Sequence, residues 1–263
     1  MTDKMPEGRL AQKFFTGDEI AGFERDGFVV VRGLFGADEM QRVSRWSDEV
    51  ESWPEIPGKY MMYFENSLLE PGKRIINRIE NFYPYHDGFR ALFEDPRVMG
   101  RLTELFREPA MLFKDKINFK YPGGDGFKHH QDQAAGWWDY ADLFISTLIS
   151  IDEATPENGC LEIAPGNDKH RRLDREWRPF TAEEIKKMNF VQVPTKPGDV
   201  IFFDSFVPHG SYPNLSSARR RILYITYNRL SDGDHRLRYY ADKRKNYPPD
   251  CEREAGKEYV FRV

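Results

Sequence analysis

The first third of the chain alternates between helical and extended patterns of apolar residues. Between residues 37 and 53, apolar side chains recur at intervals of three and four, as on one face of an amphipathic helix. Thr16 and Glu19 have the spacing of a capping box, which predicts the start of an earlier helix. The β-branched run Phe28–Val31 predicts a short strand between these two helices. Similar patterns predict strands at 60–64 and 74–79 and a helix at 96–106.

From residue 111 onward, short extended runs separated by turn residues replace the helical pattern. The nearly continuous apolar run 143–151 has the length of a strand buried on both faces. Short strands with glycine- and proline-rich turns, preceded by helices, predict a mainly β protein with flanking helices and a jelly-roll core. The predicted strands of this core are 112–121, 143–151, 160–163, 191–193, 200–203 and 222–227.

We expect a single domain over residues 1–263, because no repeat or linker-like segment interrupts the pattern. Its helices and strands at 16–106 would pack on a core at about 111–229, and a tail at 230–263 would follow. The charged segment 171–188 is typical of an exposed helical insertion, and a lid over the site is one interpretation of it.

Composition narrows the functional classes. Hydrophobic residues make up 40% of the chain and charged residues 31%, which is typical of a soluble globular protein. The net charge of −4 argues against nucleic acid as a partner, and no apolar run approaches the ~20 residues of a membrane span. Residues 1–15 lack the apolar centre of a signal peptide, and only Cys160 and Cys251 are present. These features predict a cytoplasmic protein with a small-molecule partner and leave its oligomeric state open.

Three residues form a candidate metal site. His130 and Asp132 are two positions apart, so on a strand both side chains leave the same face. His209 follows the predicted strand 200–203 and is the best candidate for a third ligand. Two imidazoles and one carboxylate form the facial arrangement that suits non-haem Fe(II) and leaves coordination positions open.

Other histidines and other chemistries compete with this interpretation. His129 lies on the opposite strand face and is expected to be a packing or surface residue. The polar surroundings of His86, His170 and His235 predict solvated surface groups. A zinc hydrolase built on the same three ligands and a jelly-roll binding protein without turnover are the alternatives.

Three consecutive arginines precede the strand 222–227. A buried arginine at this point would need a planar anion, and a carboxylate matches its fork of donors. Arg220 shares a strand face with Tyr224, whereas Arg219 and Arg221 share the other face. Alternation alone does not decide which arginine faces the site.

These motifs together resemble the phytanoyl-CoA dioxygenase family of Fe(II)/2-oxoglutarate oxygenases. The resemblance extends from about residue 16 to about residue 228. Within the family the chain looks closest to ectoine hydroxylase and free amino-acid hydroxylases. The matching segments are 23–34 (FERDGFVVVRGL), 130–132 (HQD), 158–161 (NGCL), 164–166 (APG), 197–199 (PGD) and 209–211 (HGS) with Arg220.

The resemblance implies a double-stranded β-helix (jelly-roll, cupin-like) that binds Fe(II) and uses 2-oxoglutarate and O2 as co-substrates. The residues it implies for each role are His130, Asp132 and His209 for the metal, Arg220, Ser211 and Asn118 for 2-oxoglutarate, and Lys116, Trp137 and Trp138 for the substrate. It implies no catalytic residue beyond the metal ligands.

The expected reaction is hydroxylation of an unactivated C–H bond with release of succinate and CO2. A small polar, zwitterionic substrate is expected: an amino acid, a betaine-like compound or an aminoalkylphosphonate. The alternative is a larger natural product or an acyl-CoA. Leu148 stands where acyl-CoA-processing relatives place a tryptophan, which argues against the acyl-CoA. Asp132 argues against halogenation, because halogenating relatives have a small residue at this ligand position.

Overall fold

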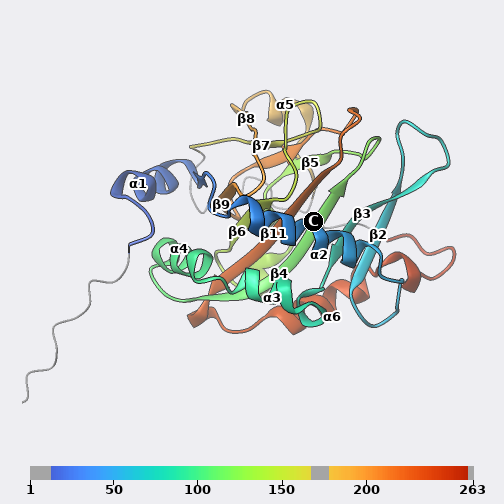
Figure 1. Cartoon of the computed structure of the whole chain (residues 1–263), viewed down its shortest axis with the longest axis horizontal. Helices are drawn as coiled ribbons and strands as arrows, with labels where there is room; N and C mark the ends of the chain where they lie inside the picture. Colours follow the sequence, from blue (N-terminus) through green and yellow to red (C-terminus); the bar gives the residue numbers. More distant parts are fainter. Residues whose placement is uncertain (1–12, 167–177, 260–263) are drawn as a thin grey trace, which may run out of the picture.

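Two antiparallel sheets form the centre of the computed structural model, which describes residues 13–166 and 178–259 (Figure 1). The strands are β1 (Phe28–Val31), β2 (Met61–Asn66), β3 (Arg74–Glu80), β4 (Ala110–Lys120), β5 (Phe127–His130), β6 (Ile145–Ser150), β7 (Leu161–Ile163), β8 (Val191–Val193), β9 (Val200–Asp204), β10 (His209–Ser211) and β11 (Arg220–Arg229). Among the described residues, the large sheet has the order β1-β9-β6-β11-β4-β3-β2 and the small sheet the order β5-β10-β7-β8. The expected mainly β architecture is confirmed.

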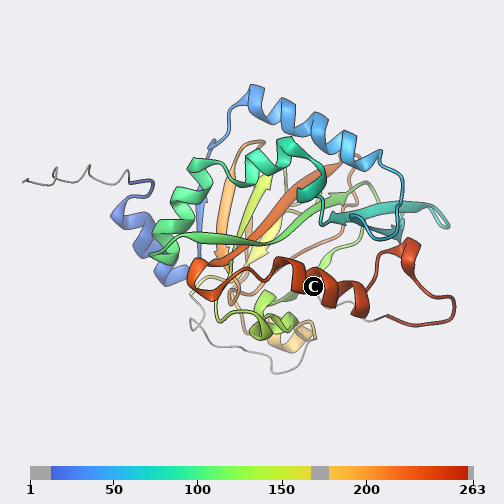
Figure 2. The same ribbon diagram turned by 90° about the horizontal axis from the view of Figure 1, so that it is seen from below.

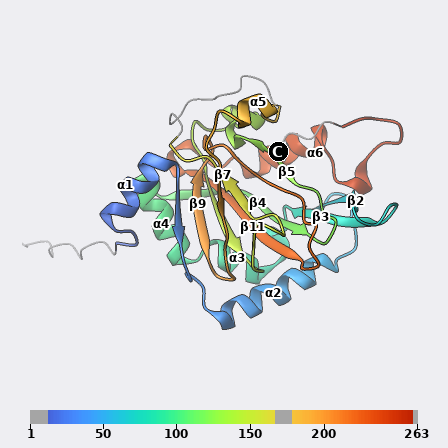
Figure 3. The ribbon, with the colours of Figure 1, turned by 90° about the horizontal axis from the view of Figure 1, so that it is seen from above.

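Helices cover the outer face of the large sheet (Figure 3). They are α1 (Gly17–Asp26), α2 (Ala37–Glu51), α3 (Asp87–Phe93) and α4 (Pro96–Phe106), with α5 (Ala182–Ile185) and α6 (Arg236–Asn246) later in the chain. Val43 of α2 and Leu102 of α4 belong to one buried cluster with Ile117 of β4 and Leu223 of β11. The predicted capping box is present, because Thr16 and Glu19 satisfy each other's backbone N–H groups.

The two central strands, β4 and β11, place polar side chains on the inner face of the large sheet. Side chains alternate along a strand, so Ile117 and Phe119 point toward the helices while Lys116 and Asn118 point toward the small sheet. On β11, Tyr224 shares this inner face. All of these residues except the half-buried Tyr224 are at most 9% exposed. A polar inner face on buried strands marks the position of a site.

The segment expected as a tail contains α6, which packs across one end of the large sheet (Figure 2). Its tyrosines, Tyr239 and Tyr240, are buried in a cluster with Phe113 and Trp137. Few aliphatic residues occur in this helix, so the sequence lacked the usual apolar stripe that predicts a docked helix.

Two further expectations concern the surface. Of the charged segment 171–188, residues 171–177 lie outside the described residues, and α5 is the only helix in the remainder. No helix in 13–166 or 178–259 is long and apolar enough to cross a membrane.

Candidate active site

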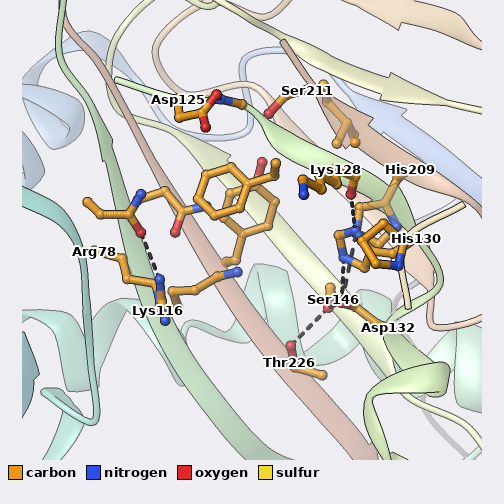
Figure 4. Close-up of a pocket in the computed structure, with 18 of the residues that line it drawn as sticks. Arg78, Lys116, Asp125, Lys128, His130, Asp132, Ser146, His209, Ser211 and Thr226 are labelled. Atoms are coloured by element: carbon orange, nitrogen blue, oxygen red, sulfur yellow. Dashed lines mark hydrogen bonds and ion pairs between the residues drawn. The ribbon is translucent and has the colours of Figure 1, made fainter. Parts of the chain in front are cut away.

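A cavity of about 430 Å³ opens between the two sheets, a size typical of small-ligand sites. Both sheets contribute to its walls (Figure 4), and the expected site residues that meet there come from five elements of the chain. Those that line it are Lys116, Asn118, His130, Asp132, Trp137, His209 and Ser211.

His130, Asp132 and His209 converge at one wall of this cavity. His130 ends β5 and His209 begins β10, and the two residues are direct partners in the antiparallel pairing of these strands. Their Nε2 atoms lie 3.5 and 3.8 Å from Asp132 Oδ1. One ligand atom from each residue lies within 4.8 Å of the others, so the three could bind a single metal ion.

Backbone carbonyls orient both imidazoles. His130 Nδ1 lies 2.6 Å from the Lys128 carbonyl oxygen, and His209 Nδ1 lies 3.0 Å from that of Val207. Because a carbonyl oxygen only accepts, each Nδ1 carries the proton, which leaves Nε2 unprotonated to bind a metal. Burial, reinforced by His130, lowers the pKa of His209 to about 4, so its ring is neutral at physiological pH.

Asp132 lies just beyond the strand on which it was expected. It begins the 3-10 helix η2 (Asp132–Ala135), but Gln131 is still extended, so His130 and Asp132 keep the same face. Burial alone would raise the pKa of the Asp132 carboxyl, yet His209 and His130 hold it well below its usual range. The carboxylate is therefore ionised, as metal binding requires.

The structure distinguishes the three consecutive arginines, which strand alternation alone could not do. Arg220 is fully buried on the inner face, and its Nε, Nη1 and Nη2 have no hydrogen-bond partner among the described residues. Arg221 is also buried, but it faces the helices and binds Asp152 through two nitrogens. Arg219 is on the exposed surface with Asp48. A buried guanidinium without a partner fits a carboxylate ligand, so Arg220 is the candidate anchor for 2-oxoglutarate.

Ser211 and Asn118 lie at the same end of the cavity. Beside them lies Lys120, which the sequence analysis did not single out. Ser211 Oγ accepts a hydrogen bond of 2.7 Å from Lys120 Nζ. Asn118 Oδ1 is buried without a hydrogen-bond partner among the described residues. Lys120 follows Lys116 and Asn118 at intervals of two, so alternation along β4 could have placed it on the inner face.

A cluster of cations forms the opposite wall. Lys114 and Lys116 of β4 and Arg78 of β3 line the cavity, and the buried carboxylate of Glu80 on β3 lies beside them. Glu80 accepts hydrogen bonds from Arg78 Nε at 2.8 Å and from Lys243 Nζ of α6 at 2.6 Å. Burial alone would raise the pKa of Glu80, but Lys243, Lys114 and Arg78 lower it well below its usual range.

Lys116 forms no hydrogen bond or ion pair with any other described residue, and it is only 9% exposed. Burial, reinforced by Lys114, lowers the pKa of Lys116 to about 7. Lys114 lies two positions before Lys116, so alternation along β4 could have placed it on the same face. Arg78 and Glu80 were missed because the pairing of β3 with β4, which the sequence does not specify, brings them beside Lys116.

The two adjacent tryptophans have different positions. Trp137 is 2% exposed, lines the cavity and packs against Phe113 and Phe144. Trp138 does not line this cavity; its ring packs on Phe206 and is 37% exposed. The structure therefore brings only Trp137 to the site.

The expectation for His86 was wrong. His86 is 8% exposed, caps α3 by accepting from the Phe89 N–H, and packs edge-on against Trp46. Its polar neighbours concealed this role as a helix cap. His235 is half-buried, and His170 lies outside the described residues. His129 is buried on the far side of β5 from the cavity, 2.9 Å from Glu162.

Residues 23–222 match the family described as Phytanoyl-CoA dioxygenase (PhyH). The chain belongs to the phytanoyl-CoA dioxygenase family. Two curated relatives cover most of its length. A 2-aminoethylphosphonate dioxygenase of the uncultured bacterium HF130_AEPn_1 is 40% identical, with 94% of each chain covered. A methylphosphonate hydroxylase of Gimesia maris is 36% identical, with 88% of each covered.

Solved structures support the same fold for this member of the phytanoyl-CoA dioxygenase family. The crystal structure of EctD from S. alaskensis with 2-oxoglutarate and 5-hydroxyectoine has a TM-score of 0.71 at 24% identity, covering 86% of this chain and 80% of that chain. The jelly-roll expectation is confirmed. Family membership and the His–Asp–His cluster make the protein an Fe(II)- and 2-oxoglutarate-dependent dioxygenase, in preference to a zinc hydrolase or a non-catalytic binding protein.

Proposed function

We propose that this dioxygenase hydroxylates a C–H bond of a small zwitterionic organophosphonate, an aminoalkylphosphonate, with release of succinate and CO2. The observation that carries the proposal is the cation cluster of Arg78, Lys114 and Lys116 on one cavity wall. Lys243 adds a fourth cation behind them, and Glu80 accepts hydrogen bonds from Arg78 and Lys243. A buried wall that presents several cations to the cavity favours a ligand that carries more than one negative charge.

The cation wall faces the metal ligands across the cavity, as the positions of Arg78 and Lys116 relative to His130 show (Figure 4). A phosphonate held by these cations would leave its carbon chain directed toward the metal. The names of the two relatives, which act on 2-aminoethylphosphonate and on methylphosphonate, support the same headgroup.

Two acidic residues at the cavity support an amino group on the substrate. Glu65 and Asp125 line the cavity, and burial raises the pKa of Glu65. Asn77 Nδ2 donates to Glu65 at 2.8 Å and holds the carboxylate in place. An ammonium group would supply the positive charge that a half-buried carboxylate lacks.

The ligand roles are part of the proposal. His130, Asp132 and His209 would hold Fe(II), since their donors are two unprotonated Nε2 atoms and an ionised carboxylate. Arg220, with Ser211, would bind the distal carboxylate of 2-oxoglutarate. When bound, the iron and 2-oxoglutarate supply O2 activation for hydroxylation of the substrate.

The remaining residues of the chain position the substrate and keep water out. Asn118 offers a buried amide to the co-substrate, and Lys116 offers an ammonium to the substrate. Trp137 closes the wall beside Lys114, whose Nζ lies 5.3 Å from the ring centroid. A dry, charged cavity strengthens each of these contacts.

The packed elements between residues 16 and 252 support a single catalytic domain. Cys160 and Cys251 are both unpaired, which supports a reducing, cytoplasmic location.

The experiment is a substrate panel with the iron-loaded enzyme and 2-oxoglutarate. Succinate release and the gain of one oxygen by mass spectrometry are measured with 2-aminoethylphosphonate, methylphosphonate, ectoine, free amino acids and an acyl-CoA. We expect coupled turnover with phosphonates and the highest kcat/KM with the aminoalkylphosphonate. Turnover confined to ectoine, amino acids or the acyl-CoA would overturn the proposal.

Variants connect the activity to the cation wall. Lys116→Met should raise the KM for the phosphonate, because it removes one cation from the wall. Lys73→Met is the matched control, since Lys73 is exposed and pairs with Glu70 away from the cavity. An unchanged KM in Lys116→Met would mean that the phosphonate does not bind at Lys116.

A further inference from the structure

A hydrogen-bonded pair of side chains lies on the outer face of the small sheet, behind the candidate metal ligands. Because a carboxylate only accepts, His129 Nε2 donates to Glu162 Oε2, at 2.9 Å. Both residues are 7% exposed. Side chains alternate along β5 and β7, so the pair faces away from the cavity that His130 and Leu161 line. The pair is buried, yet it has no part in the site described so far.

The pair reaches across a whole strand of the sheet. β10 lies between β5 and β7, and its middle residue, Gly210, is the strand partner of Glu162. A Cβ atom at Gly210 would lie 2.8 Å from His129 Cδ2 and 3.0 Å from His129 Cα, which is closer than side chains pack. The glycine of the HGS motif therefore leaves the space through which the imidazole reaches the carboxylate.

Backbone pairing alone holds β10 weakly to β5. β10 is three residues long, and its pairing with β5 is irregular between His209 and Ser211. Such an irregularity disrupts the ladder of backbone hydrogen bonds locally. His209 must nevertheless stay opposite His130, because only then do both rings point toward Asp132 (Figure 4).

Neighbouring residues fix both members of the pair. Phe190 packs edge-on against the His129 ring, with centroids 4.3 Å apart. The Phe180 N–H donates to the His129 carbonyl oxygen at 2.8 Å. Gln192 of β8 donates to the second carboxylate oxygen of Glu162 at 3.3 Å. Side chains that are fixed by packing and by hydrogen bonds can hold the strands that carry them.

We propose that His129 and Glu162 are positioning residues for the metal site, because their hydrogen bond across Gly210 fixes β10 between β5 and β7. The fixed strands keep the two histidine ligands on one ion. The inference rests on the ligand set under the proposed function. Both residues face away from those ligands and act only through the strands. Loss of the hydrogen bond should therefore weaken metal binding in a protein that still folds.

Metal binding by the folded protein tests the pair directly. Metal-free protein is titrated with Co(II), a substitute for Fe(II) whose visible spectrum reports the geometry of the ligands. Glu162→Ala removes the acceptor, so it should raise the Kd about tenfold and alter the spectrum. Glu162→Gln keeps an oxygen that can accept from His129 Nε2 and should restore both. Glu183→Ala is the matched control, since Glu183 is exposed and pairs with Lys186.

A purely structural role would give a different result. Circular dichroism shows whether each variant is folded, and urea unfolding measures the stability of the metal-free protein. A Glu162→Ala protein that loses stability but binds Co(II) with the Kd and spectrum of the parent would overturn the proposal. The same loss of affinity in Glu162→Gln as in Glu162→Ala would also overturn it. If Glu162→Ala does not fold, Glu162→Asp decides, because it shortens the side chain by one methylene and should raise the Kd in the same way.

A wrong ligand set can be recognised separately. Asp132→Ala should lose Co(II) binding whatever the state of the outer pair. If it binds Co(II) like the parent, the ligand assignment has failed, and the inference fails with it. The titration contains neither phosphonate nor 2-oxoglutarate, so an error in the substrate assignment would not change its result.

Discussion

Replacing Lys116 with methionine should stabilise the protein even as it weakens substrate binding. Burial and Lys114 lower the pKa of Lys116 from 10.5 to about 7 in the folded protein. In the unfolded chain the amine has its ordinary pKa. Folding below pH 10.5 therefore either buries a charged ammonium or releases its proton, and both cost free energy. The interval between the two pKa values corresponds to about 5 kcal/mol, which is an upper bound for the gain from removing the amine. Methionine fills a similar volume and carries no charge.

The pH dependence of unfolding gives a second check on whether Lys116→Met stabilises the protein. The pKa of Lys116 is lower in the folded protein than in the unfolded chain. The free-energy cost of burying its amine is therefore largest below pH 7 and disappears as the pH approaches 10.5. The stability difference between Lys116→Met and the parent should therefore be largest near pH 7 and small at pH 10. Urea unfolding of the metal-free proteins, followed by tryptophan fluorescence at both pH values, measures the difference in the free energy of unfolding. Lys73→Met should match the parent at both.

A Lys116→Met protein that is less stable than the parent at pH 7 would refute the reasoning. A gain in unfolding free energy that is as large at pH 10 as at pH 7 would also refute it, because better packing alone does not depend on the protonation of Lys116. The two readouts, stability and the KM for the phosphonate, should move in opposite senses, as is common for charged groups retained for binding.

Five other substitutions test separate parts of the protein. Asp132→Ala should abolish iron binding and hydroxylation while circular dichroism shows an intact fold; residual iron-dependent turnover would contradict the ligand assignment. Arg220→Ala should raise the Kd for 2-oxoglutarate about 100-fold or more, from the loss of charge-assisted hydrogen bonds of ~1.5–3 kcal/mol each. Arg221→Ala should leave that Kd unchanged but cost about 3 kcal/mol of unfolding free energy, because Asp152 loses two charge-assisted side-chain hydrogen bonds. Trp137→Ala should cost ~3–5 kcal/mol in denaturant unfolding, whereas Trp138→Ala should cost much less; equal losses would contradict their different burial.

The strands and two residues of the candidate metal site could be predicted because their signals are local. The helix Pro96–Phe106 was placed to the residue, and the spacing of His130 and Asp132 was enough to put both on one face. His209 could be named as the third candidate ligand from its place after the strand 200–203, but the pairing of β5 with β10 that brings it beside His130 could not be predicted.

The cation wall could not be predicted, because it is assembled from strands far apart in the sequence. Arg78 and Glu80 reach Lys116 only through the pairing of β3 with β4. Lys243 arrives from α6, whose sequence lacks an apolar stripe. Lys120 had a local signal in the alternation along β4, whereas its cross-strand partner Arg220 could be found only from the register of β4 and β11.

The division of the site between two sheets has an evolutionary consequence. The two histidines of the candidate metal site lie on β5 and β10 of the small sheet, whereas the cations proposed to bind the substrate lie on β3 and β4 of the large sheet. A descendant enzyme could exchange its substrate headgroup through substitutions on β3 and β4 while inheriting the oxygen chemistry intact. Glu80 restricts the route, because losing it would leave several buried cations without their shared carboxylate. New specificities should therefore arise most readily by removing a lysine first and Glu80 afterwards.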